Sequence, residues 1–126
     1  MRWPWQNSRL KMSESEAKTV LRTHFFLLEE MGQAYRNREL SPAYFQKAET
    51  LCQQIIEMSP VVARAFMTEN FPYLPRNPGF DQLAIIREKQ GDFTRALAIC
   101  EEAKRQGWKG DWDKRIDRLS SKLDKT

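Results

Sequence analysis

Three pairs of a capping residue followed by proline, Ser41-Pro42, Ser59-Pro60 and Asn77-Pro78, constrain how this chain folds. Serine and asparagine side chains accept hydrogen bonds from the free N–H groups at a helix start. Proline suits the first helical position because its missing N–H would have had no partner there. Each pair therefore predicts the start of a helix. On this basis we expect helices over Pro42–Met58, Pro60–Glu69 and Pro78–Gln90.

Apolar residues recur at steps of three and four along the chain, which is the period of an amphipathic helix. Ser13 and Glu16 match a capping box, and the apolar pattern after them predicts a helix from Glu14 to Asn37. No stretch shows the strict alternation of a half-buried strand. Two later helices follow aspartate caps, over Asp92–Gly107 and Asp111–Leu123. We therefore expect an all-α protein of about six helices.

The size and composition of the chain fit a single globular domain. It has 126 residues, of which 40% are hydrophobic and 30% charged, a balance that argues against disorder. We expect an irregular N-terminal tail over residues 1–12 and one helical domain over 13–126. No apolar run approaches the roughly 20 residues that cross a bilayer, and the start lacks the apolar core of a signal peptide. A cytoplasmic protein without a membrane span is expected.

Large apolar residues, small residues and one glycine occur at characteristic intervals over the two predicted helices from Phe80 to Trp108. The residues concerned are Phe80, Leu83, Ala84, Gly91, Phe93, Ala96, Cys100 and Ala103. This arrangement resembles the tetratricopeptide repeat, a helix–turn–helix unit with a glycine at its turn. Arg87 stands where the family usually has an aromatic residue, and Trp108 replaces its closing proline.

An earlier and weaker copy of the pattern resembles the same repeat, with extra residues in the turn over 36–41. Its positions are Leu28, Met31, Gly32, Tyr35, Ala48, Cys52, Ile55 and Pro60. The resemblance implies antiparallel helix pairs in a short right-handed array of about two repeats, closed by the last helix as a cap. Two repeats are few for such an array, because each repeat needs neighbours to bury its apolar faces. A homodimer, in which a second copy supplies those neighbours, is therefore also considered.

The resemblance also implies a function, because arrays of this family bind peptides or helices of other proteins on a concave face. We expect a non-catalytic adaptor or scaffold whose protein partner is not identified. In the family, the first helix of each pair builds most of that face. The matching positions here are Tyr35, Gln82, Ile86, Arg87 and Gln90. Arg87 stands at a position where the family packs an aromatic side chain. We therefore expect Arg87 to be exposed and to attract acidic groups.

The proline-rich loop over 70–77 is unusually apolar for a surface loop. Its residues Phe71, Tyr73 and Leu74 are expected to fold back over the core. The alternative is that Tyr73 and Arg76 stand at the rim of a partner groove, since aromatic residues and arginine dominate interface energies.

The net charge of +4 comes entirely from the C-terminal end of the chain. Residues 104–126 carry 8 basic and 4 acidic side chains, whereas the 13 basic and 13 acidic side chains before them cancel. A solvated helix face is the expected reading, because a nucleic-acid footprint usually needs a denser basic stripe. The rival hypothesis is a nucleic-acid-associated protein that uses Lys104, Arg105, Lys109, Lys114, Arg115, Arg118 and Lys122.

The residues that often carry chemistry lack the partners that catalysis or metal binding needs. His24 is the single histidine and is expected to pack. Cys52 and Cys100 lie among apolar residues without the spacing of a zinc site, and we expect them to be buried and reduced. We therefore expect no catalytic residue, no metal and no cofactor.

Overall fold

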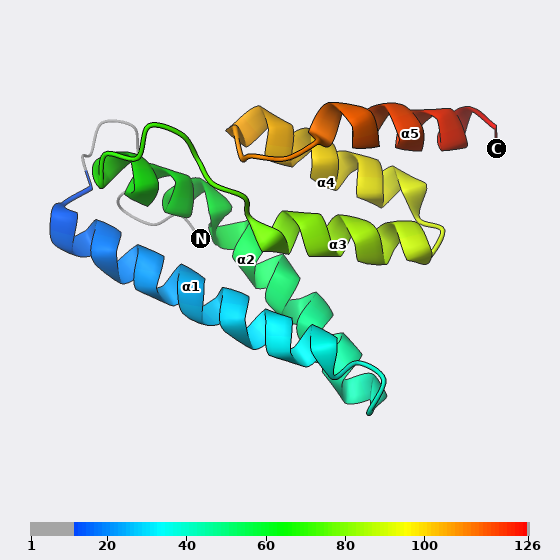
Figure 1. Cartoon of the computed structure of the whole chain (residues 1–126), viewed down its shortest axis with the longest axis horizontal. Helices are drawn as coiled ribbons and strands as arrows, with labels where there is room; N and C mark the ends of the chain where they lie inside the picture. The colour runs from blue at the N-terminus through cyan, green and yellow to red at the C-terminus, as the bar shows by residue number, and fades with distance from the viewer. Residues whose placement is uncertain (1–11, 126) are drawn as a thin grey trace.

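The computed structural model describes residues 12–125, and this part of the chain forms five helices and no strand (Figure 1). The helices are α1 (Glu14–Arg36), α2 (Pro42–Thr68), α3 (Pro78–Lys89), α4 (Phe93–Gln106) and α5 (Trp112–Asp124). The all-α prediction is confirmed. The tail predicted over residues 1–12 lies outside the described residues except for Met12. None of the described helices is long and apolar enough to cross a membrane.

The prediction of six helices is wrong, because Ser59-Pro60 lies inside α2 rather than at a helix start. Proline lacks the N–H that would bond to the carbonyl oxygen of Ile56, four residues earlier. The Ser59 hydroxyl donates a 2.6 Å hydrogen bond to that same oxygen and is fully buried. Ser59 therefore replaces the donor that Pro60 removes, and the two predicted helices, Pro42–Met58 and Pro60–Glu69, are one.

The other predicted helix starts are confirmed. The side chains of Ser13, Ser41 and Asn77 accept hydrogen bonds from backbone N–H groups of the first turns of α1, α2 and α3. Asp92 caps α4 in the same way. Asp111 occupies the N-cap of α5 without a side-chain hydrogen bond. Local capping chemistry thus determines where most of the helices begin.

Each helix packs mainly on its neighbour in the sequence. The long helices α1 and α2 run side by side in opposite directions, α3 packs on α2, and α4 and α5 follow in turn beyond α3 (Figure 1). One core cluster holds buried residues from all five helices, among them Ala17, Phe66, Phe80, Cys100 and Leu119. The described part of the chain is therefore joined by a shared core.

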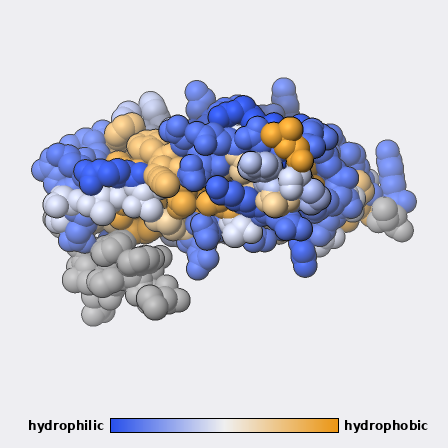
Figure 2. All heavy atoms as spheres, turned by 90° about the horizontal axis from the view of Figure 1, so that it is seen from below, coloured by the Kyte–Doolittle hydropathy of each residue, from blue (hydrophilic) through white to orange (hydrophobic). Residues whose placement is uncertain are grey.

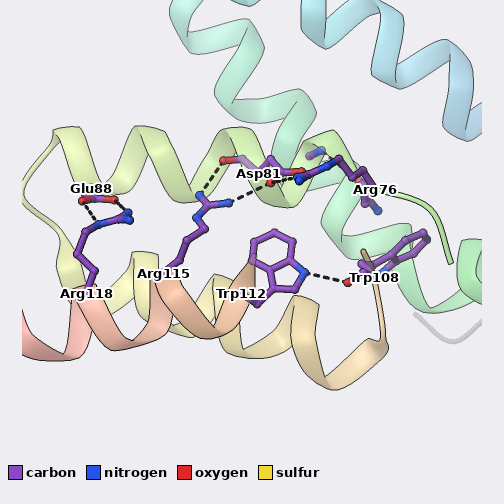
Figure 3. Close-up of polar contacts among 9 residues, drawn as sticks. Arg76, Asp81, Glu88, Trp108, Trp112, Arg115 and Arg118 are labelled. Carbon is purple, nitrogen blue, oxygen red and sulfur yellow. Dashed lines mark hydrogen bonds and ion pairs between the residues drawn. The ribbon is translucent and has the colours of Figure 1, made fainter. Parts of the chain in front are cut away.

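Charged side chains of α5 form ion pairs with carboxylates of α3 (Figure 3). The guanidinium of Arg115 donates to a carboxylate oxygen of Asp81 at 3.0 Å. Glu88 accepts from Arg118 at 2.7 Å and from Lys122 at 2.8 Å. These two hydrogen bonds hold the pKa of Glu88 at about 2, well below its usual range. The position of α5 is thus determined by ion pairs as well as by its apolar side.

Candidate partner-binding surface

Two of the predicted partner-binding residues, Ile86 and Arg87, lie in the interior. Ile86 is 1% exposed and Arg87 is 8% exposed. The Arg87 guanidinium forms an ion pair with Glu49 of α2 and donates a 3.1 Å hydrogen bond to Gln90. The prediction that Arg87 is exposed is therefore wrong, because a carboxylate on the neighbouring helix stabilises its charge where the family places an aromatic ring.

The remaining predicted residues lie in separate places. Tyr35 packs on the same core cluster as Ile86 and lies under the Arg38 guanidinium, 4.1 Å from the ring centroid. Gln82 is half-buried on α3, and Gln90 is exposed just after it. With Ile86 and Arg87 buried among them, these residues do not form one continuous face. Their role in partner binding stays a prediction.

The loop over 70–77 divides between the core and the surface. Leu74 packs against the main core cluster, as expected. The Phe71 ring lies edge-on to Phe66 at 5.0 Å but remains 45% exposed. Tyr73 is 81% exposed, so the expectation that it folds over the core is wrong. The two prolines restrict the backbone of this short segment, which does not bring all three side chains inward.

An exposed aromatic pair forms where the loop meets α1. Phe25 of α1 and Phe71 of the loop both contact the buried ring of Phe66, at 6.1 Å and 5.0 Å between ring centroids. Phe25 is 52% exposed. We call Phe25, Phe71 and the neighbouring Tyr73 the aromatic surface. From the side of α1, Figure 2 shows hydrophobic residues gathered over the left and central part of the molecule, next to mostly hydrophilic surface.

Phe25 is half exposed although it follows the apolar spacing of α1. The helical period puts it among the inward residues of α1, beside His24. One residue corresponds to about 100° around a helix, so the two side chains leave α1 in different directions. His24 is 1% exposed, whereas Phe25 lies at the border of the buried stripe. The consecutive phenylalanines Phe25 and Phe26 were the available signal, since one helix face does not bury both.

The aromatic surface lies on a rigid base of further rings. His24 packs against Phe66 and stacks on Trp108, with ring centroids 6.2 Å and 6.4 Å apart. Burial lowers the pKa of His24 to about 4, so the imidazole is neutral near pH 7. Its Nδ1 atom has no hydrogen-bond partner in the described part of the chain. The packing role expected for His24 agrees with this position.

Two cations lie at the edge of the loop. The backbone N–H of Lys109 donates to the carbonyl oxygen of Pro75 at 3.2 Å, and Arg76 pairs with Lys109 in an isolated β-bridge. Arg76 also lies 3.4 Å from Asp81 and keeps about half of its side chain exposed. Lys109 is exposed. A loop that offers aromatic rings beside an arginine has the composition of an interface hot spot.

Most of the basic C-terminal residues have acidic partners. Arg115, Arg118 and Lys122 pair with Asp81 and Glu88, as described above. Lys104 pairs with Asp113, and Arg105 with Glu102. Among residues 12–125, only Lys109 and Lys114 of the seven have no ion pair. This internal neutralisation disfavours a phosphate-binding stripe.

Catalytic and metal-binding chemistry find no support in the described residues. No group of three or more His, Cys, Asp or Glu side chains in residues 12–125 could hold a metal ion. Cys52 and Cys100 are free and fully buried, and burial raises the pKa of both thiols, that of Cys52 to about 12. Such thiols are poor nucleophiles.

Comparison with known proteins adds no further evidence. No protein-family model, no curated protein and no solved structure matches the chain. Function is therefore inferred from the geometry of the aromatic surface.

Proposed function

We propose that this protein is a non-catalytic interaction module that binds another protein through the aromatic surface. The observation that carries the proposal is the packing of two half-exposed rings, Phe25 and Phe71, on one buried ring, Phe66. Isolated exposed apolar residues are common, whereas two half-exposed rings that pack on the same buried ring are a feature of binding sites.

The aromatic surface suits binding energetically because two of its rings, Phe25 and Phe71, already pack on Phe66 before a partner arrives. A side chain that is already ordered loses little conformational freedom on binding, whereas a mobile one costs about 0.5–1.5 kcal/mol. Phe71 is held by Phe66 and by the hydrogen bond from its N–H to the carbonyl oxygen of Phe66 at 3.1 Å. The surface is thus preorganised for contact with apolar side chains.

We also propose the tetratricopeptide-like arrangement as the architecture of the module, with α1–α2 and α3–α4 as its two helix pairs. Cys52 and Cys100, which occupy corresponding positions in the two sequence patterns, are both fully buried on the second helix of their pair. Helix α5 buries Trp112 and Leu119 and exposes mostly polar residues, as a terminal cap requires. The free thiols favour a cytoplasmic location.

A pair of charge substitutions tests the proposal. Proteins captured from the native cell by the wild-type chain are compared with those captured by Phe25→Glu/Phe71→Glu. We expect the double variant to lose a partner, since truncating a hot-spot residue costs about 2 kcal/mol or more, roughly thirtyfold in affinity. Titration of the purified partner by calorimetry measures that change.

Phe26→Glu is the matched control, because Phe26 is equally exposed on α1 and makes no ring contact with Phe66 in the described structure. It should retain the partner. Circular dichroism checks that all variants remain helical. If the double variant binds every captured protein as tightly as the Phe26→Glu control does, the aromatic surface is not the binding site.

A further inference from the structure

A pocket of about 390 Å³ lies between the first half of α1 and the second half of α2. Helix α1 contributes Glu16, Thr19, Val20 and Thr23, and α2 contributes Met58 and Val61. This volume lies within the range of sites that accept a small ligand or one large side chain.

The pocket is apolar on its inside. Val20 and Val61 belong to the main core cluster and are almost fully buried. The hydroxyls of Thr19 and Thr23 donate to the backbone carbonyl oxygens one turn earlier, each at 3.1 Å. Because these donors are already satisfied within the helix, the pocket offers few polar groups to an occupant. An apolar side chain is the group that it fits.

The charge at the mouth of the pocket is negative. Glu16 is the one charged side chain that lines it, is exposed, and forms no ion pair within the described part of the chain. Glu57, one turn before Val61 on α2, is also exposed and without an ion pair among residues 12–125. Glu16, as the one charged side chain of the lining, favours a cation next to the apolar group, and Glu57 lies outside that lining.

The basic residues Lys18 and Arg22 of α1 lie beside the pocket and are not part of its lining. Lys18 is paired with Glu14 at 3.3 Å. Lys18 and Arg22 line a separate, shallower depression that shares Ser15 and Thr19 with the pocket. They therefore leave Glu16 free to attract a positive charge.

The pocket is distinct from the aromatic surface. Thr23 and Phe25 are two residues apart on α1, so their side chains point about 200° apart around the helix. Binding at the pocket is therefore independent of the function proposed for Phe25 and Phe71.

We propose that this pocket binds an amphipathic helix of a partner protein through one large apolar side chain that has a lysine or arginine one turn away. The parallel rows of side chains on α1 and α2 provide the kind of groove into which a third helix packs. Residues one turn apart on that helix lie about 5–6 Å from each other, so the apolar group enters the pocket while the cation meets Glu16.

Synthetic helical peptides of one length test the chemistry of the occupant against the full chain. The first carries tryptophan with arginine four residues later, the second replaces the arginine with glutamate, and the third replaces the tryptophan with alanine. By fluorescence anisotropy, the first should bind. The alanine peptide should bind at least about tenfold more weakly, since it lacks the apolar group. The glutamate peptide should bind several-fold more weakly.

Protein variants locate the site. Thr23→Arg places a bulky cation at the exposed rim and should abolish binding of the first peptide, whereas Thr94→Arg makes the same change on an exposed position of α4 and should leave it unchanged. Glu16→Lys should reverse the preference, so that the glutamate peptide becomes the tighter ligand. Absence of binding, equal effects of Thr23→Arg and Thr94→Arg, or an unchanged preference in Glu16→Lys would each overturn the proposal.

Discussion

At the scale of the residue, His24 is the most sensitive group in the described core. Its imidazole is almost fully buried between α1, α2 and the turn before α5, in contact with Phe66 and Trp108. The unfolded chain binds a proton on this histidine near its ordinary pKa of 6.5, whereas burial lowers the pKa to about 4 in the folded state. Between these values the unfolded state binds more protons than the folded one.

The protein should therefore lose stability as pH falls from about 6.5 towards 4. The difference between the two pKa values corresponds to a loss of about 3 kcal/mol in the free energy of unfolding. This loss develops only below about pH 6.5. Urea denaturation at pH 7.5, 6 and 5 measures the loss. His24→Leu should unfold with a flatter pH dependence over the same range. Identical pH profiles for the two proteins would contradict the assignment.

Arg87 shows, at the same scale, that the surroundings of a side chain decide whether it is buried or exposed. By sequence position it is an exposed substitute for an aromatic residue. In the structure its charge is buried against Glu49 and Gln90. Replacing a buried, paired cation leaves the partner carboxylate without compensation. A change such as Arg87→Glu is thus a test of folding, not of partner binding.

At the scale of the element, the continuity of α2 depends on Ser59 and Pro60 acting together. Pro60 removes the N–H that would bond to Ile56, and the Ser59 hydroxyl takes its place. If Ser59 is lost while Pro60 remains, a carbonyl oxygen in the middle of the helix has no donor. An unsatisfied buried acceptor costs about 1–3 kcal/mol.

A double-mutant cycle on α2 measures this coupling. Ser59→Ala alone should lower the free energy of unfolding by about 1–3 kcal/mol. Ser59→Ala should cost clearly less when Pro60→Ala is also present, because alanine restores the missing N–H. Thermal or urea denaturation of the four proteins gives the coupling energy. Additive effects of the two substitutions would show that the hydroxyl does not replace the proline donor.

At the scale of the whole molecule, Trp108 joins the α1–α2 pair to the rest of the fold. Its ring lies within 6.5 Å, between centroids, of His24, Phe66 and Phe80, which belong to α1, α2 and α3. Its carbonyl oxygen accepts a 2.9 Å hydrogen bond from the Trp112 indole at the start of α5 (Figure 3). One residue in a turn thus contacts three helices through its ring and a fourth through its backbone carbonyl oxygen.

Trp108→Ala should cost about 3–5 kcal/mol, as large-to-small substitutions of buried aromatic residues do. Because the lost contacts connect the α1–α2 pair to α3, unfolding should also become less cooperative. Urea titrations followed by circular dichroism and by the fluorescence of Trp112, in proteins that also carry Trp3→Phe and Trp5→Phe, test this, and the two probes should give different midpoints in the variant. A single shared transition with a loss below 1 kcal/mol would contradict the joining role.

The sequence by itself determined the helices. Periodic apolar residues and the caps Ser13, Ser41, Asn77 and Asp92 act within a few residues of where they stand, so their effect is readable locally. The same local reasoning failed at Ser59-Pro60. A serine before proline either caps the start of a helix or donates to the carbonyl oxygen that the proline leaves without a partner inside a helix. The continuous helical pattern on both sides of the pair decides between these outcomes.

Only the tertiary structure decided which side chains remain outside. Phe25 and Phe71 pack on the buried ring of Phe66 and stay about half exposed, whereas Arg87 is buried and paired with Glu49 of another helix. These outcomes depend on contacts between residues far apart in the sequence, such as Glu49 and Arg87. The candidate binding surfaces therefore arise from through-space packing, which local periodicity does not encode.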